Sequence, residues 1–464
     1  MGSEITYRKL KDCAVWYSGG TPRKSNAEYW NGTIPWISAK SLHDTFICDS
    51  EDKVTELGAQ NGTRTVPEGT ILFVVRGMSL KNEFRVGLTT DTVTFNQDLK
   101  ALLPVEGIDS HYLLYFLKSK AKDILSLVEE AGHGTGVLPT AVLQELDVPV
   151  PPLQQQKLVA KVILNFDEKI KINRQINQTL EQMAQTLFKS WFVDFDPVID
   201  NALDVGNPIP EVFETRVERR KAVRESADFK PLPDDVRQLF PSEFEESELG
   251  WVPKGWGYKK AKESATISIG KTPPRKQTEW FSDSASGENV TWVSIRDMGN
   301  FGAYTQASSE YLVPEAMSKF NVKRVPKGSV LLSFKLTLGR VSIARKELAT
   351  NEAIAHFVSP KFSISSEYLY CYLSTFDYGS LGSTSSIATA VNSKIIKDMP
   401  VLVPSEAVLE KFCHVVAPYF ERLKVTDDET LALEQLRNVL LPKLISGELR
   451  LDSPEVEKAK ALVE

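Results

Sequence analysis

The chain has 464 residues, of which 42% are hydrophobic and 25% are charged, and its net charge is −6. This composition excludes a disordered or fibrous chain and is sufficient for more than one hydrophobic core. Four scattered cysteines without a C-x-x-C pair exclude a disulfide scaffold and a zinc site. No apolar run approaches the ~20 residues of a membrane span, and the N-terminus lacks the apolar core of a signal peptide, so we expect a cytoplasmic protein.

The sequence contains two similar stretches. Residues 18–42, SGGTPRKSNAEYWNGTIPWISAKSL, are echoed by residues 268–298, SIGKTPPRKQTEWFSDSASGENVTWVSIRDM. The echo continues in order, pairing 66–72 with 325–331, Asn96-Gln97 with Asn351-Glu352, and 112–117 with 368–373. A separation this long indicates a duplicated domain, since solenoid repeats recur at about 20–50 residues. We therefore expect a pseudo-two-fold molecule.

The first copy, residues 1–152, is predicted to be an α/β unit. Its β-branched and aromatic runs at 70–75 and 85–90 are bounded by Gly, Pro and Asn, as strands are, and residues 110–118 are typical of a short helix. The segment Gly132-His133-Gly134-Thr135-Gly136 could cradle a phosphate. A simple turn is the favoured interpretation, because glycine also serves only to turn the chain.

A long amphipathic helix is predicted after each copy, over residues 153–196 and 405–450. The first carries Ile163, Phe166, Ile170, Ile176, Leu180, Met183 and Leu187 on one stripe, and the second carries Leu409, Phe412, Val416, Tyr419, Leu423, Leu433, Leu440 and Leu444, with Thr426, Thr430 and Arg437 interrupting. Pro418 is predicted to kink or break the second helix, and Pro442 and Gly447 to mark its end. We expect the two helices to pack as an antiparallel coiled coil; in the alternative, each packs on its own globular copy.

Residues 197–250 are predicted to form an irregular but ordered connector. It contains a short charged helix over 212–224, and its apolar residues should attach it to the helices, namely Trp191, Phe192, Phe195, Phe240 and Phe244. Its carboxylates are interpreted as solvated linker charge rather than catalytic groups, because no base, nucleophile or metal ligand lies at a useful spacing.

Charge is distributed unevenly along the chain. Residues 1–150 hold 15 Lys and Arg against 19 Asp and Glu, a net charge of −4, whereas residues 251–403 hold 19 against 12, a net charge of +7. The second copy, residues 251–404, thus suits a polyanionic partner. The first copy would need a basic face within an acidic total. A tail, residues 451–464, closes the chain.

Catalytic motifs are missing from the sequence. It has no G-x-x-x-x-G-K-[ST], H-E-x-x-H or G-x-S-x-G, and no Asn-Pro-Pro-aromatic or Asp-Pro-Pro-aromatic tetrapeptide. The five histidines, His43, His111, His133, His356 and His414, are isolated, and Asp167-Glu168-Lys169 is interpreted as the solvent face of its helix. The sequence therefore favours a binding or organising protein over an enzyme.

Three segments carry a resemblance to a known family. Residues 187–198, LFKSWFVDFDPV, with residues 247–256, SELGWVPKGW, resemble the mid-protein connector of the specificity subunit of type I restriction-modification systems, and residues 440–449, LLPKLISGEL, resemble its closing signature. The SGGTP-like, IPWIS-like and VPVPPLQQQ-like segments are similar to those of its target-recognition domains. The resemblance covers nearly the entire chain.

This resemblance implies a non-catalytic subunit that recognises double-stranded DNA. Two target-recognition domains would each read half of an asymmetric bipartite site, and the antiparallel helices would fix the spacer between the halves. The expected partners are two methyltransferase subunits, which bring S-adenosylmethionine for adenine-N6 methylation, and two restriction subunits, which bring ATP hydrolysis and Mg for cleavage. No cofactor is expected on this chain.

Candidate DNA-contacting residues are the cations near the repeated motifs, because Arg and Lys pair with phosphate or with guanine O6 and N7. They are Arg23, Lys24, Lys40, Arg76, Lys81 and Arg85 in the first copy, and Lys271, Arg275, Lys276, Arg296, Lys335 and Arg340 in the second. Asn96 and Asn351 could read adenine, but a structural turn is favoured, and Trp36 and Trp292 are interpreted as core.

Two other functions remain open from the sequence. One is a coiled-coil scaffold that binds no DNA and joins two copies of a protein partner, which the acidic first half favours. The other is an enzyme whose active site matches none of these motifs, which the absence of catalytic motifs disfavours. The target bases, the spacer length and the half-site read by each copy do not follow from the sequence.

Overall fold

The computed structural model describes residues 5–131, 135–381 and 391–463. Its contacts divide the chain into two compact units, Met1–Asn173 with Glu429–Glu464, and Arg174–Asp428. Each unit therefore holds one complete copy and a stretch of both long helices, so the division cuts across the six segments expected from the sequence. The expected Gly132–Gly136 turn includes His133 and lies mostly outside the described residues.

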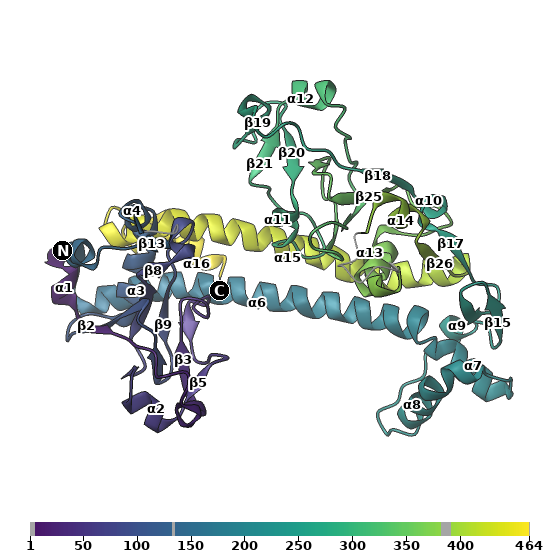
Figure 1. Ribbon diagram of the computed structural model, residues 1–464, viewed down its shortest axis with the longest axis horizontal. Helices are drawn as coiled ribbons and strands as arrows, with labels where there is room; N and C mark the ends of the chain where they lie inside the picture. The colour runs from purple at the N-terminus through teal and green to yellow at the C-terminus, as the bar shows by residue number, and fades with distance from the viewer. Residues whose placement is uncertain (1–4, 132–134, 382–390, 464) are drawn as a thin grey trace. The chain divides into compact units, whose positions relative to one another are not determined.

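The first copy, in unit 1, is a mixed α/β fold (Figure 1). Its strands are β1 (Thr6–Lys9), β2 (Ala14–Ser18), β3 (Trp30–Ile37), β4 (Phe46–Ile47), β5 (Lys53–Val54), β6 (Arg64–Val66), β7 (Ile71–Val74), β8 (Arg76–Gly77), β9 (Val86–Thr89), β10 (Val93–Phe95), β11 (Leu99–Pro104), β12 (Glu129–Ala131), β13 (Thr135–Val137) and β14 (Asp147–Val150). Its helices are α1 (Leu10–Cys13), α2 (Glu56–Gln60), α3 (Ser110–Ser119), α4 (Ala121–Ser126) and α5 (Thr140–Gln144), with 3-10 turns η1 (Ala27–Tyr29) and η2 (Met78–Lys81). The strands and helix predicted around residues 70–118 are confirmed.

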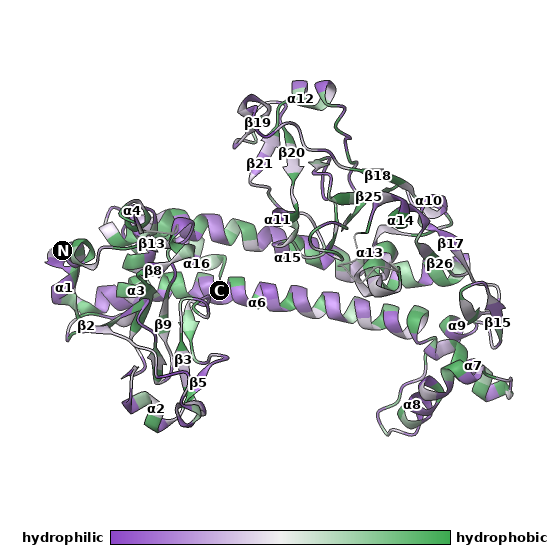
Figure 2. Cartoon of the chain, in the orientation of Figure 1, coloured by the Kyte–Doolittle hydropathy of each residue, from purple (hydrophilic) through white to green (hydrophobic). Residues whose placement is uncertain are grey.

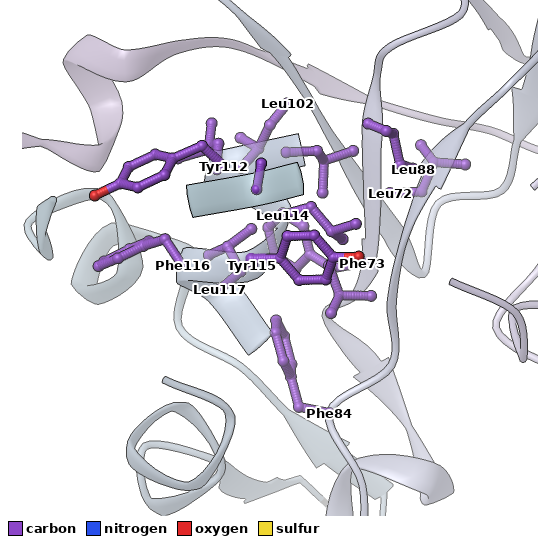
Figure 3. Packing of buried hydrophobic residues seen from close by; sticks show 14 of the residues in the cluster. Leu72, Phe73, Phe84, Leu88, Leu102, Tyr112, Leu114, Tyr115, Phe116 and Leu117 are labelled. Atoms are coloured by element: carbon purple, nitrogen blue, oxygen red, sulfur yellow. The ribbon is translucent and has the colours of Figure 1, made fainter. Parts of the chain in front are cut away.

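The core of unit 1 lies between α3 and the sheet ordered β2-β11-β7-β9-β4. Tyr112, Tyr115 and Phe116 of α3 are each 1% exposed and belong to one buried cluster with Phe73 and other apolar residues, part of which Figure 3 shows. Asp109 begins α3 by accepting a hydrogen bond from the Tyr112 backbone N–H. A second sheet, ordered β5-β3-β10-β6, carries the motif that opens each copy.

The second copy, in unit 2, shares much of this order of elements. Its strands are β17 (Gly257–Lys260), β18 (Thr266–Ile269), β19 (Phe281–Ser282), β20 (Val290–Val293), β21 (Glu310–Leu312), β22 (Val330–Ser333), β23 (Val341–Ile343), β24 (Ala349–Thr350), β25 (Ile354–Val358) and β26 (Pro400–Val403). Its helices are α10 (Ala261–Ser264), α11 (Ile295–Met298), α12 (Pro314–Lys319), α13 (Ser366–Thr375) and α14 (Ser393–Asp398), with 3-10 turns η6 (Thr278–Trp280) and η7 (Tyr378–Leu381).

Strand pairing confirms that the domain is duplicated. The order β2-β11-β7-β9 in unit 1 recurs as β18-β25-β22-β23 in unit 2, and the pair β1-β14 recurs as β17-β26. The parallel pairing of Trp36 with Thr94 recurs between Trp292 and Ala349. Two domains with one topology therefore follow each other along the chain, and each is followed by a long helix.

The long helices are α6 (Leu153–Phe188), extended by the π-helical η4 (Lys189–Val193), and α15 (Glu406–Ser446). Green and purple residues alternate along α6 in Figure 2, as in an amphipathic helix. In unit 1 the Asp167 side chain pairs with Arg437, and in unit 2 the Phe188 ring contacts Phe412. Within unit 2, Asn177 bonds Asp427 and Phe188 contacts Phe412, so later residues of α6 meet earlier residues of α15, which confirms antiparallel packing. Each helix stretch also packs into the core of its unit, so the alternative interpretation holds in part.

Pro418 does not break α15 and Pro442 does not end it, contrary to the prediction, whereas the helix does end before Gly447, as predicted. Pro418 and Pro442 both lie within the helix, which ends at Ser446 before Gly447 with φ +77°. Both prolines are exposed, as are His414 and Asn438, whose carbonyls each proline leaves without a helical N–H partner. Those carbonyls can bond water, and the buried face of the helix remains intact.

Two predictions about helix faces are also wrong. Met183 is 45% exposed, and Ala184 takes its place in the core. Asp167, interpreted as part of a solvent face, has a side chain only 11% exposed. It accepts hydrogen bonds from Tyr115 Oη at 2.9 Å and from Arg437 Nη1 at 2.5 Å. A carboxylate between two donors can be buried within an amphipathic stripe, which a count of apolar residues does not detect.

The connector in unit 2 is ordered, as expected. It comprises α7 (Asp196–Val205), η5 (Glu211–Phe213), α8 (Glu214–Arg224), α9 (Asp234–Arg237), β15 (Phe244–Ser247) and β16 (Gly250–Pro253). Trp191 packs edge-on against Phe240 and Phe412, which attaches it to α15. Its carboxylates are not all solvated, contrary to the prediction: the Asp200 side chain is 10% exposed and bridged by both nitrogens of Arg220 at 2.9 and 2.5 Å.

The segment after α15 belongs to unit 1. Helix α16 (Pro454–Ala461) begins at Ser453, whose hydroxyl accepts the Val456 N–H. Val456 and Ala459 are buried in the core of unit 1, so this part of the expected tail is a docked helix. Among the described residues, the apolar stretches of the helices are too short or too charged for a membrane span.

Candidate nucleic-acid interface

Three segments of the first copy meet at one end of its sheets. The Gly20 N–H donates to the Phe95 carbonyl at 2.9 Å, and the Asn96 N–H donates to the Ile37 carbonyl at 2.9 Å. The Val75 N–H donates to the Asp98 carbonyl at 2.8 Å. We name this group of segments, Gly20–Lys24, Asn96–Asp98 and Val75–Arg76, the first edge.

The second copy builds the same edge from its own segments. The Lys271 N–H donates to Thr350 at 2.9 Å, the Asn351 N–H to Val293 at 3.0 Å, and the Phe334 N–H to Ala353 at 2.9 Å. We name residues Lys271–Lys276, Asn351–Ala353 and Phe334–Lys335 the second edge. The two edges share a backbone framework bond for bond.

The asparagines and tryptophans of the repeats hold this framework. Asn96 Oδ1 accepts the Asp98 N–H at 3.1 Å, and Asn351 Oδ1 accepts the Ala353 N–H at 3.2 Å, an Asx turn in each copy. Trp36 and Trp292 are 5% and 1% exposed, and each donates its indole N–H to the backbone of its Thr-Pro turn. The structural interpretation of all four residues is confirmed.

The residue after each asparagine points outward and was missed as a site candidate. Thr21 Oγ1 donates to Gln97 Oε1 at 2.6 Å, and Thr272 Oγ1 donates to the Glu352 carboxylate. Gln97 and Glu352 are both exposed. The signal was present in the repeat, since Asn-Gln stands where the other copy has Asn-Glu.

The Glu352 carboxyl group has a lowered pKa. Partial burial raises the pKa, but the hydrogen bond from Thr272, a backbone N–H, and the charges of Lys335 and Arg275 outweigh that effect. These two cations therefore lie close enough to Glu352 to stabilise its charge. The second edge is an electropositive surface with one ionised carboxylate within it.

The candidate cations of the first copy lie in three surroundings. Arg23, Lys24 and Arg76 are exposed on the first edge. Lys40 is exposed after β3, and Lys81 pairs with Glu130 at 3.3 Å. Of these cations, only Arg23, Lys24 and Arg76 belong to the segments of the first edge.

In the second copy, Lys271, Arg275, Lys276 and Lys335 lie exposed on the second edge, and Arg296 is exposed on α11. Arg275 is held in place: its two terminal nitrogens contact Glu310 at 2.6 and 2.9 Å, and its guanidinium lies 4.4 Å from the Phe281 ring centroid. Such a held guanidinium is less available to a ligand than a free lysine.

Arg85 and Arg340 are bound to backbone carbonyls of their own domains. Arg85 Nη1 donates to the Ala39 carbonyl at 3.1 Å, and Arg340 Nη1 donates to the Ile295 carbonyl at 2.7 Å. Ala39 and Ile295 each follow the serine of the repeated Trp-Ile-Ser or Trp-Val-Ser. The two arginines are therefore equivalent framework residues that tie the strand after the edge loop to the opening motif.

The buried histidine of the second copy has structural partners. His356 is fully buried, and burial lowers its pKa to about 4. Its two ring nitrogens lie 2.9 Å from Ser268 Oγ and 2.7 Å from Thr350 Oγ1. Within residues 5–131, 135–381 and 391–463, no three His, Cys, Asp or Glu side chains gather as a metal site.

Comparison with known proteins accounts for the duplicated edges. The chain matches the family described as the type I restriction modification DNA specificity domain over residues 2–182 and again over residues 253–425. The chain belongs to this family. It is thus a DNA specificity subunit of the type I restriction-modification class, and each match spans one edge together with part of the helix that follows it.

Relatives of this specificity subunit extend over most of its length. It is 25% identical over 456 residues to the MjaIX specificity subunit of Methanocaldococcus jannaschii, covering 96% of this chain and 93% of the relative. It is 29% identical over 357 residues to the HindI specificity subunit of Haemophilus influenzae, covering 72% and 76%. Among solved structures, an S subunit from M. genitalium aligns over 96% of both chains with a TM-score of 0.49 and 14% identity.

Proposed function

We propose that this specificity subunit reads an asymmetric, bipartite DNA site, with the first edge on one half-site and the second edge on the other. One observation carries the proposal: the two edges share the same backbone hydrogen bonds but present different exposed side chains. Both edges repeat the same backbone hydrogen bonds, but Arg76 corresponds to Lys335, and Gln97 to Glu352. Readers of one architecture with different side chains select different bases.

Exposed cations on the first edge support DNA contact by that copy as well. Residues 1–150 carry a net charge of −4, yet Arg23, Lys24 and Arg76 lie together and exposed. Phosphate contact depends on local positive charge, not on the total of a domain. The exposure of these three cations supports a basic face on the first copy despite its acidic total.

The partners follow from family membership. The chain would bind two methyltransferase subunits, which methylate adenine N6 with S-adenosylmethionine, and two restriction subunits, which use ATP and Mg to translocate and cleave DNA in the cytoplasm. A duplicated chain offers two similar surfaces to two copies of a partner. The specificity subunit itself would perform no chemistry.

The test is co-expression with a candidate methyltransferase subunit, followed by sequencing that detects N6-methyladenine in the modified DNA. We expect methylation at one motif with two different specified parts and a fixed unspecified spacer. A stable 2:1 complex without methylation or DNA affinity would contradict the proposal and support the protein scaffold instead.

A further inference from the structure

Gln97 and Glu352 are the chemically different members of otherwise matched turns. Each follows the Asx-turn asparagine and precedes the residue whose carbonyl accepts the N–H of Val75 or Phe334. Backbone bonds on both sides therefore fix the position of each side chain. A residue that varies on a fixed framework is suited to choosing a base.

The threonine of each Thr-Pro turn then fixes the side chain itself. Thr21 Oγ1 donates to the amide oxygen of Gln97 at 2.6 Å, and Thr272 Oγ1 donates to one carboxylate oxygen of Glu352. Among the described residues, the Gln97 amide nitrogen donates to no protein atom, and the second Glu352 oxygen accepts from no protein side chain. Both side chains are exposed, so these groups can meet a ligand.

The two free groups have opposite hydrogen-bonding characters. Gln97 keeps two amide donors and a second lone pair on its oxygen, which match the N7 acceptor and N6 donor of adenine in the major groove. Ionised Glu352 can only accept. It matches the N4 donor of cytosine, whereas adenine N7 beside N6 would repel it.

Charge on the second edge supports this difference. A carboxylate near phosphates is unfavourable unless it accepts a hydrogen bond from a base. Glu352 is flanked by Lys335 and Arg275, whose charges stabilise its ionised form. An electropositive surface with one carboxylate combines backbone attraction with selection of a donor base.

We propose that Gln97 and Glu352 are equivalent specificity-determining residues, with Gln97 reading an adenine in one half-site and Glu352 reading a cytosine in the other. Thr21 and Thr272 are their positioning residues. The inference rests on the proposed function, since it needs a bipartite target read by both edges.

The experiment compares methylated motifs made by the complete methyltransferase complex with wild-type subunit, Gln97→Glu and Glu352→Gln. We expect Gln97→Glu to change one position of one half-site from adenine towards cytosine, and Glu352→Gln to make the reverse change in the other half. Gln97→Ala should lower discrimination at that position by roughly 5- to 150-fold. Thr21→Val should relax the same position.

Glu106→Gln is the matched control. Glu106 is exposed beyond the far end of β11, whereas Gln97 lies before its start, so this exchange should leave the motif unchanged. Thermal unfolding of each variant tests that the fold persists.

The outcomes separate the two proposals. If the wild-type complex produces no bipartite motif, the proposed function fails and takes this inference with it. If the wild-type motif is bipartite and folded Gln97→Glu and Glu352→Gln leave every position unchanged, the base assignment is overturned and the proposed function stands. Changes in both halves from one substitution would also overturn it.

Discussion

Cations around the edges fall into two classes that the sequence does not distinguish. Arg85 and Arg340 each donate a hydrogen bond to a framework carbonyl, whereas Arg76 and Lys335 extend from the edge as exposed side chains. The first class stabilises the fold, and the second is available to phosphate. Removing one charge should therefore have different consequences in each class.

Arg340→Met and Lys335→Met make this distinction measurable. Arg340→Met leaves the Ile295 carbonyl without its charged donor and should lower the free energy of unfolding by about 1.5 kcal/mol. Lys335→Met should change stability by less than about 0.5 kcal/mol. Because it removes a phosphate contact, it should reduce the slope of log affinity against log salt by about 0.9. Urea unfolding and DNA titration check both; an Arg340→Met protein with native stability would contradict the framework role.

Close approach requires glycine at the residue directly before each edge, Gly19 in the first copy and Gly270 in the second. A Cβ on Gly19 would collide with the Phe95 and Asn96 carbonyls, and a Cβ on Gly270 would collide with the Thr350 and Asn351 carbonyls. These contacts join the Thr-Pro turn to the Asx turn. A side chain at either position would therefore push the Thr-Pro turn away from the Asx turn.

Gly270→Ala should cost about 2 kcal/mol of stability, in the range of an overpacked core, and should abolish specific methylation through the second half-site. Gly257→Ala is the control, because nothing lies within 4 Å of its added Cβ and its φ is not positive. Unfolding curves and the methylated motif are the measurements. Equal behaviour of the two variants would show that the close approach is unimportant.

Among the elements, α6 and α15 meet through polar as well as apolar pairs. In unit 1, Asn173 Nδ2 donates to Glu429 Oε2 at 3.1 Å, and in unit 2, Asn177 Nδ2 donates to Asp427 Oδ1 at 2.6 Å. Polar pairs between helices favour one register, since any shift leaves them unpaired. The spacing of apolar residues predicted that the two helices pack together, but it could not predict these polar contacts in the middle of the pair.

A double-mutant cycle on Asp167 and Arg437 tests the pair in unit 1. Arg437→Leu should cost about 3 kcal/mol, because it leaves a nearly buried carboxylate with only the Tyr115 hydroxyl. Asp167→Leu should cost less, since the Arg437 side chain is 25% exposed and can reach water. The double substitution to leucine should be nearly neutral. Additive losses in urea unfolding would exclude coupling between the two residues.

Asp427 makes the stability of unit 2 fall as the pH rises. Burial raises its pKa from 3.8 to about 6, and nearby Glu181 adds to the effect while Arg345 and Asn177 oppose it. The folded state therefore holds this proton more tightly than the unfolded state. Its contribution to stability is fully present below pH 3.8 and is lost as the pH rises through about 6.

Asp427→Asn should remove this loss and leave unit 2 more stable than wild type at pH 7. The urea midpoint, followed from pH 4 to pH 7, should fall less steeply in the variant than in the wild type. Asp283→Asn is the control, because Asp283 is exposed and is not among the groups that shift the pKa of Asp427. A wild-type slope in Asp427→Asn would show that another group, such as Glu181, carries the pH dependence.

Across the whole molecule, sequence predicted what depends on repetition and apolar spacing. The duplication, the long helices and the core tryptophans were predicted from residues that recur in both copies. Asp167, Asp200 and the prolines of α15 were mispredicted, because burial of a charge or tolerance of a proline depends on which side chain or solvent lies opposite. Gln97 and Glu352 were not predicted, because a repeat identifies positions by the residues that are alike in both copies, and these two differ.

The unequal charge of the two copies leads to a final prediction for the whole molecule. Replacing Lys271, Arg275 and Lys276 by alanine should weaken DNA binding and reduce the salt slope by between about 1.8 and 2.7, at about 0.9 per phosphate contact. The lower value applies if Arg275, already paired with Glu310, contributes little. In the first copy, Arg23→Ala with Lys24→Ala should reduce the slope by about 1.8, because local exposure and not the net charge of −4 decides contact. An unchanged slope in either variant would remove that Thr-Pro turn from the DNA interface.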